Sequence, residues 1–547
     1  MTRVVQGDQV EKNQEIVVVY HNRTKHRFEA YAKGPETLDW DSQPNPFRNF
    51  DGAHSFPLPL SIEHHWNSFH TVKDSEPVAL DQSSLSLFLR HSMGLTAWKQ
   101  YGPDKWSLRV NPSSGNLHPT ETYVFLPQIN SDLSAGLYHY NVEWHSLEQR
   151  AITATPSTDH SSFLLAFSSV TWREAWKYGE RAFRYCQLDM GHALSSVVYA
   201  ARALGWQVEW LAGISSDELE SWLGLNRPEF AKVEKEIPEC LLKISVSSEP
   251  ENSEAIADNL ELPPVTSWQG TPNILGERGP YKWPVVDQIA KVTEIVGNAT
   301  KGSVPLSKLN ASVNSVDANS NEKPFDKVVL QRRSAQRFLP QSISRKSFES
   351  LIKALFSAGQ PIFNITGENE PLVHFVVMVH RVEGVEPGIY CLSGTNSAET
   401  DLRKSFSKWD EWKDQNLELP DEAKLFQLTV ANVQRANATL CCQQKIGSDC
   451  AVSIGFIVEF DKGLKRMGPQ AYRYMHWQAG MLAHQLYLEA THEGIAATGI
   501  GCFFDDPWHE LLGLLDTRWQ FLYHIALGVP EVDNRITSLS GYYYLKD

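Results

Sequence analysis

The stretch AFRYCQLDMGHALSSVVYAARALGW, residues 182–206, returns in altered form as AYRYMHWQAGMLAHQLYLEATHEGI at residues 471–495. The two segments align without a gap at a shift of 289 residues, and the shift persists to Leu225 and Leu514. The identical pairs are Ala182/Ala471, Arg184/Arg473, Tyr185/Tyr474, Gly191/Gly480, Ala201/Ala490, Gly205/Gly494, Asp217/Asp506, Leu223/Leu512, Gly224/Gly513 and Leu225/Leu514. A repeat of this spacing is too long for a solenoid unit, so it predicts two large, related domains in one chain.

A second match extends the duplication upstream. AGLYHY at Ala135 pairs with PGIYCL at Pro387 at a shift of 252 residues, so the second copy carries about 37 extra residues after this point. We place this insertion within the polar and charged range 393–450.

The domain boundaries follow from the repeat and from composition. We expect a first domain over 14–245, a second over 326–547, and a connecting segment over 246–325. The ends of the connecting segment are rich in Ser, Asn, Glu and Pro, which is typical of a linker, whereas its aromatic middle is expected to pack on the domains.

The composition excludes several classes of protein. The 547 residues are 42% hydrophobic and carry a formal charge of -15, which argues against a broad nucleic-acid or anionic-membrane surface but leaves room for a local basic pocket. The start resembles no signal peptide and no apolar run reaches the ~20 residues of a membrane span, so we expect a soluble, cytoplasmic protein. The odd number of cysteines and the lack of CxxC spacing favour reduced thiols and predict no structural metal; the cysteines are Cys186, Cys240, Cys391, Cys441, Cys442, Cys450 and Cys502.

Each copy alternates helical and extended patterns, which predicts an α+β fold. Apolar residues at helical spacing mark helices around 85–93 and 190–204. Strands are expected at TYVFLP, SFLLAFSSV, LVHFVVMVH, VSIGFIVEF and FLYHIALGV, which are rich in β-branched and aromatic residues.

The second copy opens with a cluster of cations, QRRSAQRF, just ahead of a predicted helix. Arg332, Arg333, Ser334 and Arg337 offer guanidinium and hydroxyl donors that suit a phosphate. A solvated basic loop is the alternative interpretation of this stretch.

The first copy carries RVNPSSGNLHPTETY at Arg109 instead. Pro112 shapes a tight turn, while Ser113, Ser114 and Asn116 offer short donors and acceptors that suit the edge of a flat polar ring. A plain loop is an equally good interpretation of this stretch alone.

Together these motifs resemble the FMN-dependent nitroreductase superfamily. The resemblance is carried by RRSxxRF before a helix, PSSGNxxPxETY, PGIY, a long helix ending in Gly, and LYHIALGVP. More narrowly, YHNRTKHRF, LDW, RVNPSSGNLHPTETY and KYGERAFRYCQLDMGHA resemble the SagB/ThcOx-type dehydrogenase branch, here as a tandem pair. The resemblance implies two nitroreductase-like domains, each a mainly antiparallel sheet flanked by helices, that form an intramolecular pseudo-dimer.

The resemblance also implies a composite FMN site, because in that superfamily the two segments come from different subunits. Arg332, Arg333, Ser334 and Arg337 of the second copy would face Arg109, Pro112, Ser113, Ser114 and Asn116 of the first. Backbone amides of Gly499, Ile500 and Gly501 and the late cation Arg535 are further candidates for FMN contacts. The mirror-image site would pair FRNFDG with SAGQPIFN around Gln360, and we expect it to be poor in donors and empty.

Lys177 and Tyr178 resemble the pair assigned to proton abstraction in azoline dehydrogenases of this branch. Hydride loss to flavin N5 needs a base for the second proton, and a neighbouring ammonium favours phenolate over phenol. Adjacent helical residues do not face each other, so a structural role in a helix end is the alternative.

We therefore expect an FMN-dependent oxidoreductase that transfers hydride between its substrate and flavin N5. Oxidation of an azoline-like or other heterocycle, in a small molecule or a modified peptide, is the favoured reaction. The alternatives are an NAD(P)H-dependent nitro or quinone reductase and a catalytically degenerate scaffold of a peptide-modifying complex. The expected assembly is a monomeric pseudo-dimer or a homodimer, with neither nucleic acid nor membrane as a partner.

Overall fold

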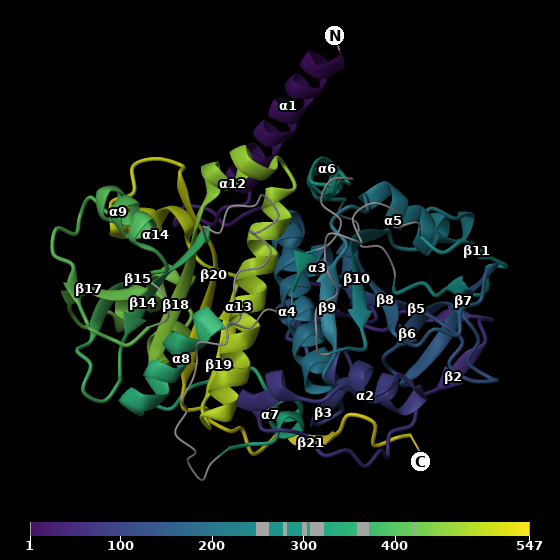
Figure 1. Ribbon diagram of the computed structural model, residues 1–547. Helices are drawn as coiled ribbons and strands as arrows, with labels where there is room; N and C mark the ends of the chain where they lie inside the picture. Colours follow the sequence, from purple (N-terminus) through teal and green to yellow (C-terminus); the bar gives the residue numbers. More distant parts are fainter. Residues whose placement is uncertain are drawn as a thin grey trace.

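The computed structural model describes residues 2–247, 262–276, 282–297, 304–306, 322–357, 371–419 and 422–545. Two antiparallel sheets lie on either side of a central pair of long helices (Figure 1). The α+β class and the two nitroreductase-like domains expected from the repeat are confirmed.

The first domain is built on a sheet with the strand order β11-β7-β6-β5-β8-β10-β9-β13, and β2 pairs with β7. Its strands are β2 (Ser55–Pro57), β5 (Thr120–Leu126), β6 (Gly136–Asn141), β7 (Ser146–Thr153), β8 (Ser162–Val170), β9 (Gln207–Trp210), β10 (Glu236–Ser245), β11 (Val265–Thr266) and β13 (Val304–Pro305). The last two strands come from the connecting segment, so part of that segment extends the first sheet. A further short pair, β1 (Phe50–Asp51) with β12 (Thr271–Pro272), joins the same two regions.

The second domain repeats this sheet. Its order is β16-β17-β15-β14-β18-β20-β19. The strands are β14 (Val373–Val379), β15 (Gly388–Ser393), β16 (Lys413–Asp414), β17 (Lys424–Val430), β18 (Val452–Glu459), β19 (Ala496–Ile500) and β20 (Trp519–Gly528). Six strands in each sheet follow the same spatial order, as a duplicated domain requires.

Helices at the repeat have matching bounds in the two domains. They are α3 (Thr171–Tyr178) and α12 (Phe460–Met467), α4 (Ala182–Ala203) and α13 (Ala471–His492), and α5 (Ser216–Leu223) and α14 (Asp505–Leu512). Helices α4 and α13 pack along each other at the centre of the molecule (Figure 1). They cross at Gly191 and Gly480, where a Cβ on either glycine would lie 2.2–2.3 Å from a backbone carbonyl oxygen of the other helix.

The remaining helices cover the sheets and fill the gaps between the repeats. They are α2 (Gln82–Ser92), α6 (Pro284–Val292), α7 (Phe325–Gln331), α8 (Arg345–Ser357), α9 (Asn396–Ser405), α10 (Gln434–Leu440) and α11 (Ile446–Asp449). The last three belong to the insertion predicted within 393–450. None of the helices in the described part of the chain is long and apolar enough to cross a membrane.

The two ends of the described chain cross over to the opposite domain. The N-terminal part of helix α1 (Thr2–Arg23) projects from the molecule (Figure 1), and its C-terminal part contacts both domains. Gln14 Nε2 donates to the Leu464 carbonyl at 2.7 Å and His21 contacts Gln520 at 3.0 Å in the second domain, while Tyr20 Oη donates to the Glu180 carbonyl at 2.7 Å in the first. At the other end, β21 (Thr537–Ser540) pairs with β3 (Leu95–Tyr101) of the first domain, which continues to β4 (Asp104–Arg109). Tyr542 extends this contact by accepting from the Leu95 N–H at 2.9 Å.

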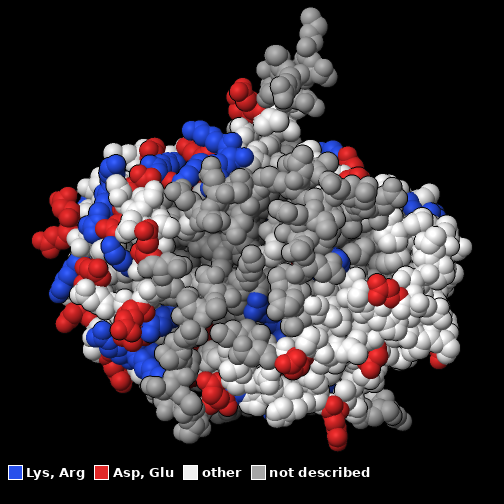
Figure 2. Space-filling view, in the orientation of Figure 1, with Lys and Arg blue, Asp and Glu red and all other residues white. Residues whose placement is uncertain are grey.

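Charge is mixed on the visible surface. Figure 2 shows Lys and Arg interspersed with Asp and Glu over the half of that face built by the second domain. This distribution agrees with the overall negative charge and offers no extended basic track on that part of the face.

Candidate functional site

A cavity of about 660 Å³ lies between the two domains. The first domain contributes Lys99, Trp106, Leu108, Arg109, Asn111, Pro112, Ser113, Ser114, Gly115, Asn116, His118, Tyr178, Tyr185 and His192. The second contributes residues 331–336, Gln444, Tyr487, Thr491, residues 495–496 and 498–502, Tyr523, residues 530–533 and Ile536. Neither domain could form this cavity alone.

Most of the predicted cofactor residues line this cavity. Arg109, Pro112, Ser113, Ser114 and Asn116 lie on one wall, and Arg332, Arg333, Ser334, Gly499, Ile500 and Gly501 lie on another. Arg337 is exposed and does not belong to the lining. Arg535 is also outside the lining, and its guanidinium is paired with Asp533, a lining residue, at 2.7 and 2.9 Å.

The Pro-Ser-Ser turn is held by Asp189 of α4, which the sequence analysis did not single out. Asp189 accepts from Ser113 Oγ at 2.6 Å and from the Ser114 N–H and Oγ at 3.0 Å each. Burial raises the pKa of Asp189 to about 7, although these three donors oppose the shift. The two serine hydroxyls are therefore anchors of the loop, whereas they were predicted to face the ligand directly.

The rest of the loop adopts an unusual backbone. Gly115, Asn116 and His118 have φ values of 58°, 61° and 52°, in the left-handed region that is uncommon for residues other than glycine. Asn116 Nδ2 donates to the Ser107 carbonyl at 2.9 Å, and its Oδ1 contacts His118 Nε2 at 2.9 Å. The polar side chains of the loop thus fix its shape.

Arg332 reaches across the domain boundary and binds the first domain's backbone. Its Nε donates to the Val110 carbonyl at 2.8 Å and its Nη2 to the Arg109 carbonyl at 3.0 Å, which leaves Nη1 without a protein partner. Burial lowers the pKa of Arg332 to about 10, so the side chain stays cationic at neutral pH. Arg332 therefore joins the two domains and still presents a buried donor.

Ser334 and Gly499 share one phenol. Tyr487 Oη accepts from the Gly499 N–H at 2.6 Å and lies 3.1 Å from Ser334 Oγ. The Gly499 N–H was predicted to donate to the ligand. It is instead used in the hydrogen bond to Tyr487 Oη.

Lys177 and Tyr178 converge on Gly115, at the end of helix α3. A Cβ built on Gly115 would lie 2.6 Å from Tyr178 Oη and 3.1 Å from Lys177 Nζ. Gly179, with φ 55°, ends the helix directly after Tyr178, which lets the two adjacent side chains reach one place. Burial, followed by the charge of Glu174, raises the pKa of Tyr178 well above its usual value, so the expected phenolate is replaced by a phenol.

The cavity wall retains polar atoms that the protein does not satisfy. Buried atoms without a hydrogen-bond partner include Asn111 Oδ1, His118 Nδ1, His192 Nε2 and Arg332 Nη1. Burial lowers the pKa of both histidines, to about 3 for His192, so the rings are neutral. Because His118 Nε2 faces Asn116 Oδ1 and His192 Nδ1 faces the Pro112 carbonyl, the unpaired nitrogen of each ring is an acceptor. Because unpaired buried polar groups are costly, this set fits a ligand with a polar ring and an anionic tail, such as FMN.

Several lining residues were missed in the sequence. Asn111 and His118 flank the Pro-Ser-Ser turn, and His192 lies in the repeated helix. Their closeness in sequence to these motifs is the feature that could have identified them. Lys99 and Trp106 lie in the β3-β4 hairpin, where nothing in the local pattern marked them.

The predicted mirror-image site, which would pair FRNFDG with the segment around Gln360, has no free cation among the described residues of its FRNFDG side. Arg48 of FRNFDG is buried, with its Nε 3.4 Å from Glu236 Oε2, so its charge is used within the first domain. Its predicted partner segment around Gln360 falls outside the described residues.

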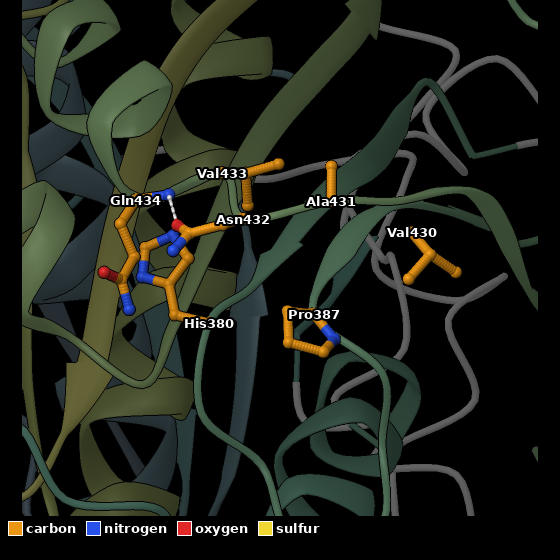
Figure 3. Close-up of a pocket in the computed structure, with 7 residues that line it drawn as sticks. All are labelled: His380, Pro387, Val430, Ala431, Asn432, Val433 and Gln434. Atoms are coloured by element: carbon orange, nitrogen blue, oxygen red, sulfur yellow. Dashed lines mark hydrogen bonds between the residues drawn. The ribbon is translucent and has the colours of Figure 1, made fainter.

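A smaller hollow of about 190 Å³ lies in the second domain beside the insertion (Figure 3). It is lined by His380, Pro387 and residues 430–434, and the Gln434 N–H donates to Asn432 Oδ1 at 3.2 Å. Its residues come from one domain, in contrast to the large cavity.

Comparison with known proteins agrees with this architecture. The model of the family described as "Nitroreductase family" matches residues 95–233 and 329–529. The chain is 28% identical over 175 residues to the trifolitoxin-processing protein TfxB of Rhizobium leguminosarum bv. trifolii, covering 29% of this chain and 47% of that protein. It is 20% identical over 195 residues to protein MJ1384 of Methanocaldococcus jannaschii, provisionally named a nitroreductase, covering 35% of this chain and 85% of that protein.

One solved structure matches nearly the whole chain. It is a protein of Anabaena variabilis ATCC 29413, provisionally named a nitroreductase, with a TM-score of 0.65 and 21% identity over 94% of this chain and 99% of that one. The chain spans about half the length of TfxB, while the family model covers most of the chain in two regions. This protein belongs to the nitroreductase family, with two copies of the domain in one polypeptide.

Proposed function

We propose that this chain is an FMN-dependent oxidoreductase of the SagB/ThcOx dehydrogenase type, with FMN held in the cavity between the domains. One observation carries the proposal: a single cavity joins the Arg332–Ser334 segment to the Pro112–Asn116 segment and keeps unpaired polar atoms in its wall. Its volume of about 660 Å³ lies within the ~300–1,000 Å³ of typical cofactor sites.

The residues divide between the two ends of such a ligand. Three cationic side chains lie in the cavity wall and would hold the phosphate, namely Arg332, Arg333 and Lys99. Asn111 and His118 would contact the ring edge with their unpaired atoms. Bound FMN would supply hydride acceptance or donation at its N5 atom.

Tyr178 and Lys177 supply the proton chemistry in this proposal. The phenol of Tyr178 and the ammonium of Lys177 lie beside Gly115 in the loop that shapes the cavity. A substrate atom placed there could exchange a proton with Tyr178 Oη, while Lys177 stabilises negative charge on the phenol oxygen.

Oxidation of an azoline-like or other heterocycle, in a small molecule or a modified peptide, is the favoured reaction. Its support is the resemblance of the motifs to the dehydrogenase branch and the similarity to a protein named for processing trifolitoxin.

Reduction of nitro compounds or quinones by NAD(P)H is the second candidate, and one observation favours it. The raised pKa of Tyr178 keeps its proton in place at neutral pH, and a phenol is suited to proton donation during reduction. A degenerate scaffold is the third candidate, favoured by the internal use of the Ser113, Ser114 and Asn116 side chains.

Flavin content and half-reactions test these candidates. The purified full chain is expected to be yellow and to release about one FMN per chain on denaturation, since the two predicted FMN segments line one cavity. Anaerobic titration with NADH, NADPH and candidate heterocycles then identifies which compound reduces the flavin. Colourless protein that fails to bind added FMN would establish the scaffold instead.

The placement of FMN is tested by a matched pair of variants. Arg332→Leu with Ser334→Ala is expected to lower flavin content at least ~10-fold, because a buried guanidinium and a hydroxyl in the cavity wall are lost. Arg337→Leu, in the same segment but outside the cavity, is the control and should retain flavin. Since Arg332 also holds backbone carbonyls, Asn111→Ala provides a second test that leaves those bonds in place.

A further inference from the structure

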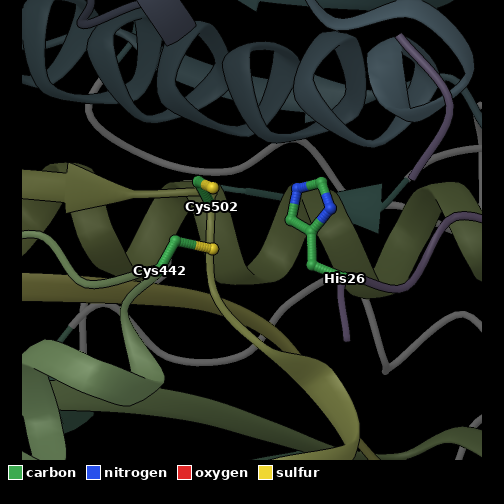
Figure 4. A group of neighbouring side chains, drawn as sticks. All are labelled: His26, Cys442 and Cys502. Carbon is green, nitrogen blue, oxygen red and sulfur yellow. The ribbon is translucent and has the colours of Figure 1, made fainter. Parts of the chain in front are cut away.

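Three side chains from distant segments meet at the edge of the large cavity. His26 follows α1, Cys442 lies between α10 and α11 in the insertion, and Cys502 follows β19. A ring nitrogen of His26 and the two sulfur atoms all lie within 4.8 Å of one another (Figure 4). Cys502 lines the cavity, so the group is accessible to a ligand there.

Hydrogen bonds between the three segments fix this arrangement. Gln444 Nε2 donates to the Cys502 carbonyl at 3.1 Å, and the Phe504 N–H donates to the Leu440 carbonyl at 2.8 Å. On the other side, the His26 N–H donates to Asp505 Oδ2 at 2.9 Å. The two cysteines and the histidine are therefore brought together by the folded backbone.

The His26 ring is positioned as a hydrogen donor. The Ala32 N–H donates to His26 Nδ1 at 2.9 Å, so Nδ1 carries its lone pair. Burial, followed by the charge of Arg181, lowers the pKa of His26, and a neutral ring with this bond has its hydrogen on Nε2. The ring thus has no free lone pair for a metal ion, but it can donate to a thiolate.

The two thiols are unequal. The Cys442 thiol donates a hydrogen bond to Cys502 Sγ, which lowers the pKa of Cys502. Burial of Cys502 raises this pKa, whereas His26 and Arg181 lower it further. The same contact raises the pKa of Cys442. Cys502 is the one of the two cysteines that lines the cavity, so a disulfide entering there meets its sulfur first. The groups facing the two sulfurs are His26, Arg181, Tyr185, Tyr31 and Cys441.

We propose that Cys442 and Cys502 form a redox-active dithiol that reduces low-molecular-weight disulfides entering the cavity. Cys502 attacks and Cys442 resolves, with His26 as the group that stabilises the attacking thiolate. This activity uses residues other than Lys177 and Tyr178 and does not depend on bound FMN.

The reaction balances without a further reagent. Cys502 Sγ bonds to one sulfur of the disulfide, and the other sulfur leaves as a thiolate that takes the proton of Cys442. Cys442 Sγ then attacks Cys502 Sγ and releases the second thiolate, which takes a proton from water. The protein dithiol is oxidised to a disulfide, and the small disulfide is reduced to two thiols.

The other cysteines provide an internal control. Cys186, Cys240, Cys391, Cys441 and Cys450 are buried, and burial raises the pKa of each. Thiols in such surroundings react slowly. Reaction is therefore expected at the pair alone.

Intact-mass and peptide mass spectrometry of the full chain test the proposal, with bis(2-hydroxyethyl) disulfide as the probe. The wild type is expected to form a Cys442–Cys502 disulfide with no retained adduct, at least ~10-fold faster than any other cysteine reacts. Cys442→Ser should trap one adduct on Cys502, because the resolving thiol is missing. Cys502→Ser should lose the fast reaction, whereas Cys391→Ser should behave like the wild type.

Three results would overturn the proposal. The first is a fast reaction that persists in Cys502→Ser, and the second is a Cys442→Ser variant that traps no adduct. The third is one zinc ion per purified chain that disappears in Cys502→Ser, which would make the cluster a metal site.

Discussion

The two domains share their strand order and helix bounds, yet the equivalent regions beside the central helices differ. On one side Gly499 lines the cavity. At the position aligned with it by the repeat, the first domain has Trp210, which is buried and packs at ring-centroid distances of 5.2 Å from Tyr474 and 5.7 Å from Trp477. A glycine lines the cavity on one side, and a buried tryptophan packs against aromatic rings at the aligned position on the other.

Two polar residues of α4 at the cavity are also replaced at the aligned positions of α13. His192 and Asp189, which face or support the cavity, align with Met481 and Gln478 in the other copy. The duplication therefore kept the strand order and the helix bounds, while positions in α4, α13 and β19 differ between the side that holds the cavity and the other side.

Removing the tryptophan tests whether its side of the molecule is purely structural. Trp210→Ala is expected to lower the free energy of unfolding by about 3–5 kcal/mol, because a large buried ring is lost. Denaturant unfolding measures this change, and flavin bound per folded chain should stay at the wild-type value.

Trp106→Ala, in the cavity wall, is the matched control and should show the reverse pattern, with a small loss of stability and a loss of flavin. If Trp210→Ala abolished flavin binding while the chain remained folded, the division into one binding side and one structural side would be wrong.

Tyr178→Phe tests the chemistry assigned to the binding side. The variant is expected to keep its FMN but to slow flavin reduction or oxidation by substrate ~10²-fold, since proton transfer at Oη is lost. Stopped-flow absorbance of the flavin measures the rate. Tyr199→Phe, a buried tyrosine of α4 outside the cavity lining, is the control, and equal rates in the two variants would reduce Tyr178 to a packing role.

Asp189→Asn probes the anchor of the Pro-Ser-Ser turn through its pH dependence. Because burial raises the folded-state pKa of Asp189 to about 7, above its usual value, its favourable contribution is present at acidic pH and is lost as the pH rises through 7. Stability curves from pH 4 to 8 should show the wild type losing about 1–3 kcal/mol relative to Asp189→Asn. A constant difference across this range would contradict the assigned proton.

His70 lies between the domains and outside the cavity lining. Of the changes considered, its substitution should have the smallest effect on the free energy of unfolding. Its Nδ1 lies 3.2 Å from Glu322 and its Nε2 3.2 Å from Glu489; burial opposes protonation, but Glu489 and then Glu322 raise the pKa of His70 to about 9. The stabilisation is complete below pH 6.5 and lost as the pH rises through 9. His70→Gln should therefore cost about 1 kcal/mol at pH 6 and almost nothing at pH 10, without changing flavin content.

The sequence was sufficient for the fold because its signals are local or repeated. The shift of 289 residues predicted both domains, and β5, β8, β14, β18 and β20 formed where β-branched and aromatic residues cluster. The two predicted cofactor segments do line one cavity.

The details of the site depend on side-chain partners that lie far apart in the chain. Ser113 looked like a ligand donor, but Asp189, 76 residues away, accepts its hydrogen bond. Likewise, the neighbouring Lys177 suggested a phenolate at Tyr178, but burial keeps it a phenol. Burial and long-range pairing are properties of the folded chain, so local motifs could not supply them.

The crossing of the two chain ends has a consequence for how a ligand enters. Helix α1, at the start of the chain, is hydrogen-bonded to the second domain. The Tyr542 region, at the other end, is hydrogen-bonded to the first domain. Hinge-like parting of the halves would have to detach both arms together and uncover the glycine crossing of the central helices. We therefore expect a ligand of the cavity to enter and leave through local motion of the cavity rim, without separation of the two domains.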